Sequence, residues 1–158
     1  MIYLSLGSNI GDRETNLRAA ISELGSRGVN ITRVSQVWET EPVDYLEQGW
    51  FLNSVVEAET GLTPKELLAA IGRIEGELGR VRGVPKGPRT IDIDILYYGA
   101  EVVRTAELEI PHPRIAERRF VLAPLADLAP ELRDPLSGRT VREMLENAPG
   151  AAVRLLHS

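Results

Sequence analysis

The segment GPRTIDIDIL, residues 87–96, decides how the rest of the chain is interpreted. β-Branched residues alternate with other residues from Thr90 to Leu96, which predicts a strand, and the Gly-Pro pair before them disfavours a helix. Successive side chains of a strand point to opposite faces, so the three isoleucines share one face and Asp92 and Asp94 share the other. At a rise of about 3.3 Å per residue, the two carboxylates stand roughly 6 to 7 Å apart.

Two carboxylates at this distance on a half-buried sheet repel each other unless a cation lies between them. Oxygen ligands on a rigid strand suit Mg²⁺, which keeps several waters and takes further ligands from substrate phosphates. On spacing alone, a solvent-facing strand edge with aspartates paired to arginines would be the favoured interpretation. Arg89 directly precedes the strand and carries a planar donor group that suits phosphate. Together with the basic segment before it, the acidic pair therefore predicts a metal–phosphate site.

The composition, 43% hydrophobic and 26% charged, is that of a globular protein, and 158 residues predict a single domain over residues 1–158. A net charge of -5 argues against a general nucleic-acid binder. The absence of cysteine excludes disulfides and thiol chemistry. The N-terminus lacks the features of a signal peptide, and no stretch approaches the ~20 apolar residues that span a bilayer. We therefore expect a cytoplasmic protein that binds neither nucleic acid nor a membrane.

The order of the predicted elements indicates an α+β fold. Four strands are predicted, at residues 2–6, 29–40, 51–59 and 90–96. One amphipathic helix is expected around residues 17–24 and another over residues 63–79, with Thr63 as its N-cap and Glu66 three residues after the cap. The order strand, helix, strand, strand, helix, strand is the βαββαβ pattern of ferredoxin-like folds, with an antiparallel sheet. Additional C-terminal elements, short helices within residues 115–128 interrupted at Pro124 and another at 141–145, are expected to cover the sheet's other face or extend one edge.

Four cations, Arg80, Arg82, Lys86 and Arg89, precede the paired carboxylates within a loop rich in Gly and Pro. The plain alternative is a solvated basic loop that balances the acidic helix before it. The arrangement is better explained by a polyphosphate that binds between the cations and the aspartates, bridged by metal. We also expect this loop to be mobile when empty and ordered by nucleotide, with Arg82 arriving on closure.

The single internal histidine and the two phenylalanines each allow two interpretations. His112 lies between prolines, where a loop or packing role is more common than catalysis, and Arg118 is close enough in sequence to fold back toward it for a phosphate contact. Core packing is the first explanation for both Phe51 and Phe120. The alternative is that a planar heterocycle stacks between the two rings.

Several motifs, in order and without large gaps, resemble one family. They are LGSNIGDR at 6–13, WETEP at 38–42 followed by FLN at 51–53, GRVR at 79–82, GPRTIDIDIL at 87–96, IPHPR at 110–114 and ERRFVLAPL at 117–125. From residue 2 to about residue 145 the chain is similar to the 6-hydroxymethyl-7,8-dihydropterin pyrophosphokinases of folate biosynthesis. The resemblance implies transfer of the β,γ-pyrophosphoryl group of ATP to the pterin hydroxymethyl oxygen, with release of AMP. It also implies a ferredoxin-like core, two Mg²⁺ ions and a monomer.

The resemblance further implies roles for individual residues. Asp92 and Asp94 would hold both metal ions. The implied catalytic residues are Arg80, Arg82, Arg89, Asp92 and Asp94. The implied ATP contacts are Glu75, Arg82, Arg89, Ile95, His112 and Arg118. The implied pterin contacts are Thr40, Pro42, Val43, Phe51, Asn53 and Phe120.

Two other classes of protein stay open on the residues themselves. An ordinary γ-phosphoryl kinase would use the same acidic pair and basic loop but would release ADP. A non-catalytic ferredoxin-like module could bind a small ligand on the same fold. The acidic pair and the arginine-rich loop argue against this second class, since a sensor has no need of two metal ions.

Overall fold

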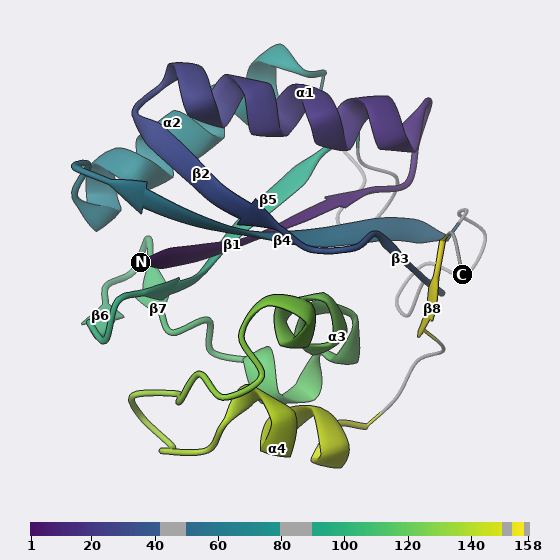
Figure 1. Ribbon diagram of the computed structural model, residues 1–158. Coiled ribbons are helices and arrows are strands. Elements are labelled where there is room, and N and C mark those ends of the chain that lie inside the picture. The colour runs from purple at the N-terminus through teal and green to yellow at the C-terminus, as the bar shows by residue number, and fades with distance from the viewer. Residues whose placement is uncertain (42–49, 80–89, 150–152, 157–158) are drawn as a thin grey trace.

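The computed structural model describes residues 1–41, 50–79, 90–149 and 153–156. One antiparallel sheet lies between two helical layers (Figure 1). β1 (Ile2–Ser8) runs through its middle, with β5 (Asp92–Tyr98) on one side and β4 (Phe51–Thr60) on the other. Beyond β4, β3 (Trp38–Thr40) pairs with the first residues of that strand and β2 (Val29–Val34) with its last. β8 (Val153–Leu155) pairs with β3 at the far edge.

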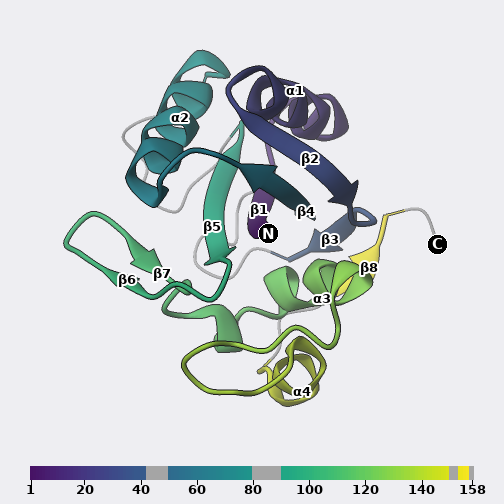
Figure 2. The same ribbon diagram turned by 60° about the vertical axis from the view of Figure 1, so that its left-hand side comes forward.

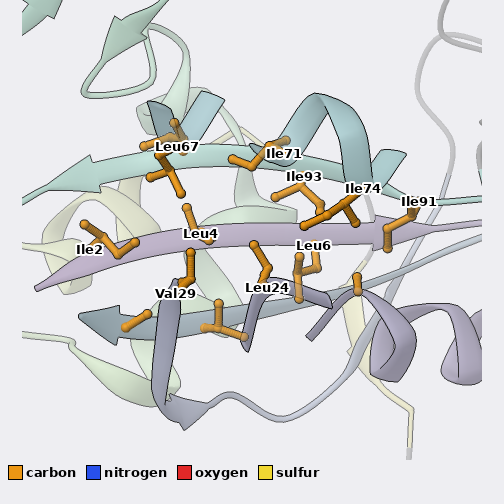
Figure 3. Packing of buried hydrophobic residues seen from close by; sticks show 14 of the residues in the cluster. Ile2, Leu4, Leu6, Leu24, Val29, Leu67, Ile71, Ile74, Ile91 and Ile93 are labelled. Carbon is orange, nitrogen blue, oxygen red and sulfur yellow. The ribbon is translucent and has the colours of Figure 1, made fainter. Parts of the chain in front are cut away.

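Helices α1 (Arg13–Ser26) and α2 (Pro64–Glu77) cover one face of the sheet (Figure 1). The side chain of Asp12 caps α1, and Thr63 forms a reciprocal capping box with Glu66 on α2, as the sequence predicts for α2. The larger apolar core, the α1–α2 core, fills the space between these helices and the sheet. Figure 3 shows its interlocking side chains, which include Ile2, Leu4, Leu6, Leu24, Val29, Leu67, Ile71, Ile74, Ile91 and Ile93.

The opposite face carries η1 (Ile115–Glu117), α3 (Arg119–Leu128) and α4 (Val141–Asn147), as Figure 2 shows. α3 packs on β4, and α4 packs on α3. A second cluster, the α3–α4 core, is made by Tyr3, Val55, Leu96, Tyr97, Ile115, Val121, Leu122, Leu125, Val141 and Met144. β6 (Val103–Arg104) and β7 (Glu109–Ile110) form a separate two-stranded sheet. The C-terminal third thus both covers the other face and, through β8, extends one edge.

An α+β architecture with an antiparallel sheet is therefore confirmed. Within the described ranges, none of the helices has the length and apolar character that crossing a membrane requires.

The single strand predicted at residues 29–40 is wrong, because the chain forms two strands there, β2 and β3. Ser35 lies in the gap and bonds Val55 of β4 twice. The Ser35 N–H donates to the Val55 carbonyl at 2.8 Å, and the Val55 N–H donates to Ser35 Oγ at 2.8 Å. A hydroxyl takes the place of a backbone carbonyl, which interrupts the ladder without leaving the buried Val55 amide unpaired.

The predicted interruption at Pro124 is also wrong, because α3 continues through this residue. Proline has no N–H, so the carbonyl of Phe120 loses the bond that it would otherwise receive. All residues from 121 to 125 are buried, packed among the sheet and the neighbouring helix. In a folded protein such packing contributes more to helix stability than one internal hydrogen bond.

β5 begins at Asp92, two residues later than predicted, and its alternation changes phase once. One register shift against β1 leaves Leu96 as an extra residue between Ile95 and Tyr97, a β-bulge. Ile95 therefore points into the α1–α2 core, whereas Leu96 and Tyr97 both lie in the α3–α4 core.

Candidate active site

The two predicted carboxylates lie at the start of β5, on the face that carries α3. Ile91, Ile93 and Ile95 are buried in the α1–α2 core, while Asp92 and Asp94 point the other way and are only half-buried. The predicted alternation is confirmed. Among the described residues β5 is the last strand on its side of the sheet, so the acidic pair lies on an edge strand.

The neighbouring strands continue this polar face. Asp92 lies opposite Gly7 of β1, and Gly7 lies opposite Asn53 of β4; Asp94 lies opposite Ser5. We call these five residues the polar row. A Cβ atom on Gly7 would come within 3.1 Å of Asn53 Oδ1. Glycine therefore leaves the middle of the row without a side chain, so that a ligand can approach the backbone there.

Asn53 is held by Thr40. Its Nδ2 donates to Thr40 Oγ1 at 2.9 Å, and both residues are buried. This bond engages the amide nitrogen and leaves Oδ1 on the side of Gly7. Thr40 is the register partner of Phe51, which is half-buried at the start of β4. The structure thus brings together three of the predicted pterin contacts.

His112 lies between β7 and η1 and is fixed by two backbone hydrogen bonds. Its N–H donates to the Leu96 carbonyl at 3.2 Å, and its Nδ1 accepts the Arg114 N–H at 3.2 Å. Burial, and then the charges of Arg118 and Arg114, lower the pKa of His112 from 6.5 to about 4. The charge of Asp92 acts weakly in the opposite direction. His112 is therefore neutral at pH 7, and its proton lies on Nε2 because Nδ1 is an acceptor.

Arg118 and Phe120 lie where η1 passes into α3. The guanidinium carbon of Arg118 is 5.7 Å from the centre of the Phe120 ring, a cation–π contact. Both residues are half-buried, and Phe120 also packs against the α3–α4 core. Phe120 therefore contributes to core packing and still presents part of its ring outside the core.

Two predicted ATP contacts, Glu75 and Ile95, have different surroundings. Glu75 on α2 is 8% exposed, and its Oε2 accepts the Ile93 N–H at 2.9 Å. The Ile93 N–H points away from β1, toward the outer edge of the sheet. The backbone groups of every second residue on a strand point in the same direction, and Ile95 is two residues after Ile93. The backbone of Ile95 therefore faces the outer edge, while its side chain lies in the α1–α2 core. A nucleotide contact at Ile95 is therefore restricted to backbone atoms.

Five predicted site residues lie outside the described residues: Pro42, Val43, Arg80, Arg82 and Arg89. The structure does fix the two ends of segment 80–89, because Thr90 Oγ1 donates to the Gly79 carbonyl at 2.8 Å. The chain therefore leaves α2 and returns to β5 at one place, two residues before Asp92.

Ser5 and Gly7 were not among the residues predicted for the site, and the strand predicted at residues 2–6 ended before Gly7. The structure places both in β1 as register partners of the acidic pair. The signal in the sequence was a glycine directly after an alternating apolar stretch, since glycine within a strand marks a close approach of another group. In the turn that follows, Asn16 Nδ2 donates to the Ile10 carbonyl at 2.9 Å.

The fold and the polar row define an α+β protein in which an acidic pair lies near a neutral histidine and an arginine, an arrangement typical of enzymes that handle phosphate groups. The chain matches the model of the 7,8-dihydro-6-hydroxymethylpterin-pyrophosphokinase family over residues 3–130. It belongs to this family. The predicted family and the predicted class of enzyme, a diphosphotransferase of folate biosynthesis, are thereby confirmed.

Relatives of known name agree with this membership. The chain is 50% identical over 143 residues to the 2-amino-4-hydroxy-6-hydroxymethyldihydropteridine pyrophosphokinase of Bacillus subtilis, covering 89% of this chain and 86% of that protein. It is 42% identical to the Aquifex aeolicus protein of the same name, over 90% and 88% of the two chains. It is also 50% identical to a mitochondrial folate synthesis bifunctional protein of pea, over 80% of this chain but only 25% of that longer protein.

Solved structures support the fold alone, because their sequence identity is low. A wild-type HPPK-DHPS of Plasmodium falciparum with pteroate superposes with a TM-score of 0.73 at 16% identity, over 92% of this chain and 43% of that one. An HPPK-DHPS in complex with substrates gives a TM-score of 0.71 at 14% identity, with 92% and 42% coverage.

Proposed function

We propose that the polar row, with His112, Arg118 and the adjoining segments, is the active site for transfer of a pyrophosphoryl group from ATP to 6-hydroxymethyl-7,8-dihydropterin. The hydroxymethyl oxygen bonds to the β-phosphorus of ATP, the bond from this phosphorus to the α,β-bridging oxygen breaks, and AMP leaves with that oxygen. The proton of the hydroxyl group passes to water. The observation that carries the assignment is the acidic pair on the same face as Asn53, near a histidine whose surroundings keep it neutral.

The acidic pair fits Mg²⁺ by its chemistry. Asp92 and Asp94 supply hard oxygen ligands from same-face positions of one strand. Across the residues that the structure describes, no group of three or more His, Asp or Glu side chains is arranged to hold a metal ion. We propose that the remaining ligands are waters and phosphate oxygens, as is usual for Mg²⁺ bound with a nucleotide. We propose two such ions, which would neutralise phosphate charge and lower the pKa of the attacking hydroxyl.

The protein's own donors would hold the phosphates. Neutral His112 offers its Nε2–H, and Arg118 offers a planar cation from the same short segment. Arg80, Arg82 and Arg89 belong to the segment that starts and ends beside the acidic pair, and we propose that they surround the triphosphate. Pyrophosphoryl transfer depends mainly on positioning and charge neutralisation, so these residues need not exchange a proton with the substrate.

Glu75 and Ile95 are proposed at the nucleotide end. Glu75 would act through the β5 backbone that it already bonds, and Ile95 through its own backbone at the outer edge.

The pterin would occupy the other end of the polar row. Asn53 Oδ1 and the Thr40 hydroxyl are amide and alcohol groups of the kind that pair with the polar edge of a heterocycle. Phe51 and Phe120 would stack on its two faces. Pro42 and Val43, in the segment between β3 and β4, complete the proposed pterin contacts.

Several finer features are also proposed. The core is proposed to be ferredoxin-like, supported by the order β5-β1-β4 with β2 and β3 outside β4 and by helical connections after β1 and β4. The protein is proposed to act as a monomer in the cytoplasm. It is proposed to require neither nucleic acid nor a membrane.

Incubation with ATP, Mg²⁺ and 6-hydroxymethyl-7,8-dihydropterin, followed by chromatography of the nucleotides, tests this function. We expect AMP and the pterin diphosphate in equal amounts. Release of ADP would instead identify a γ-phosphoryl kinase. If the protein fails to bind ATP in the presence of Mg²⁺, the non-catalytic ligand-binding module becomes the better explanation.

A further inference from the structure

Four side chains form a cluster behind the proposed pterin site, on the side of the sheet that carries α1. Arg13 begins α1, Glu39 belongs to β3, Trp50 directly precedes β4, and Arg154 is the middle residue of β8. We call this group the back-face clamp. None of its members is among the proposed substrate contacts, and they come from four separate parts of the chain.

Glu39 is the centre of the clamp. Its side chain is only 14% exposed, and Arg154 Nε donates to its Oε1 at 3.1 Å, while Arg13 Nη1 lies 3.4 Å from its Oε2. Arg13 Nη1 also donates to the Trp50 carbonyl at 2.8 Å. The guanidinium carbon of Arg154 lies 4.2 Å from the centre of the Trp50 ring. A closed set of contacts therefore joins the end of β3 to the start of β4.

The clamp is adjacent in sequence to the proposed pterin contacts but lies on the opposite face. Glu39 precedes Thr40, and Trp50 precedes Phe51, so strand alternation puts the clamp residue of each pair behind the sheet and the site residue in front. Register confirms this placement, because Glu39 pairs with Leu52 of the α1–α2 core, whereas Thr40 pairs with Phe51.

Thr40 and Phe51 are the outermost pair of β3 and β4 before the connecting segment. The last pair of a ladder, beside a connecting segment, opens more readily than the pairs behind it. β3 has only three residues, which makes this pair weaker still. β8 adds a second partner to β3 and brings Arg154, whose own partner in the register is Glu39.

We propose that the back-face clamp is a positioning element for the pterin site, which acts through Thr40 and Phe51 and touches no substrate. The C-terminal strand β8 is thereby part of the construction of that site. The inference rests on the proposed pterin contacts. An ordinary surface ion-pair role is the competing explanation, since Arg154 is 62% exposed and exposed pairs contribute little to stability.

The two explanations differ in what Arg154→Ala and Trp50→Ala change. We expect each to weaken binding of 6-hydroxymethyl-7,8-dihydropterin, measured by calorimetry with a non-hydrolysable ATP analogue and Mg²⁺ present, by about five- to tenfold, or ~1 to 1.4 kcal/mol. The KM for the pterin should rise to match, with the KM for ATP unchanged. Trp50→Phe, which keeps a ring under the guanidinium, should restore most of the affinity.

Arg142→Ala is the matched control, because Arg142 forms an exposed ion pair with Glu131 away from the sheet. It should leave both affinities unchanged. If Arg154→Ala behaves like this control, or if both substrates weaken equally along with a lower melting temperature, the clamp has no positioning role. A wild-type protein that does not bind the pterin would instead overturn the proposed function.

A double variant tests the route of the effect. In a Phe51→Ala background the positioned ring is gone, so Arg154→Ala should weaken pterin binding by a smaller factor than it does in the wild-type protein. Full additivity of the two changes would show that Arg154 does not act through Phe51 and would overturn the inference.

Discussion

The two faces of the central sheet are built from the same strands but differ in how far helices cover them. Behind the sheet, α1 and α2 cover a continuous apolar core that reaches Ile91 and Ile93. In front, the α3–α4 core ends with residues such as Tyr3 and Val55, and the polar row follows on the same face. The face that stabilises the fold and the face proposed for the chemistry are therefore separate, and substitutions on them should have separable effects.

The largest expected effect is on turnover, from removal of either carboxylate. Asp92→Ala or Asp94→Ala should reduce AMP formation by roughly 10³-fold or more, because a lost metal contact is worth several kcal/mol in the transition state. Thermal unfolding should change little, since the substitution also relieves repulsion. Glu59→Ala, an exposed carboxylate farther along the same sheet, serves as the control. Turnover near the wild-type rate in either aspartate variant would contradict the assignment.

A substitution on the face covered by α1 and α2 should lower stability and leave turnover per folded molecule in place. Leu4 is fully buried in the α1–α2 core, next to Ser5 of the polar row. Leu4→Ala should lower the free energy of unfolding by about 2 to 5 kcal/mol, because it leaves a cavity. Turnover per folded molecule should persist. Urea denaturation combined with activity measured below the unfolding transition checks this, and a large loss of turnover in fully folded protein would show that the two faces are not independent.

Phe120 lies where the α3–α4 core meets the proposed pterin site, which makes it the sharpest test of the boundary between packing and binding on the front face. Phe120→Ala should weaken pterin binding at least tenfold, about 1.4 kcal/mol, with little change in ATP binding. Asn53→Ala should act in the same direction through lost hydrogen bonds. Titration calorimetry with each ligand distinguishes the outcomes, because equal weakening of both ligands would make Phe120 a core residue only.

The smallest expected effect concerns pH. His112 has a pKa of about 4 in the folded protein, against an ordinary value of 6.5. Between these two values the unfolded chain binds more protons, so the free energy of unfolding should fall as the pH is lowered from 6.5 to 4. His112→Gln should show a shallower fall over the same range when urea denaturation is repeated at several pH values. Identical slopes would mean that His112 is not held neutral.

Local patterns made much of the fold predictable. The alternation of residues 91–95 placed the acidic pair on the other face of the strand from the isoleucines. The capping residues marked the start of α2. Both features depend only on neighbours within a few positions. The break between β2 and β3 was not predictable in this way. It depends on the pairing of Ser35 with Val55, residues that only the folded sheet brings together. Pro124 was misjudged because burial of α3 outweighs its local preference.

The residue types of the candidate site could be predicted, but the hydrogen bonds between its side chains could not. The sequence indicated Asn53 and Thr40 as members of one pocket, but the bond between their side chains depends on the register of β3 against β4. Glu75 shows the same limit. Its place on a helix followed from the sequence pattern, but neither its burial nor its bond to the Ile93 amide, 18 positions away, follows from local neighbours.

The bulge at Leu96 has a consequence for how β5 can vary among descendants of this chain. Residues before it alternate in one phase and residues after it in the other, and Leu96 is the extra residue between them. Deletion of Leu96 alone would restore plain alternation and leave Tyr97 facing Asp134, whose carboxylate accepts a hydrogen bond from the Tyr97 hydroxyl at 2.8 Å. A one-residue deletion before the bulge would instead turn the aspartates into the apolar core. The bulge is therefore the place where this strand can lose a residue, whereas elsewhere it accepts an exchange of side chains far more readily than a change in length.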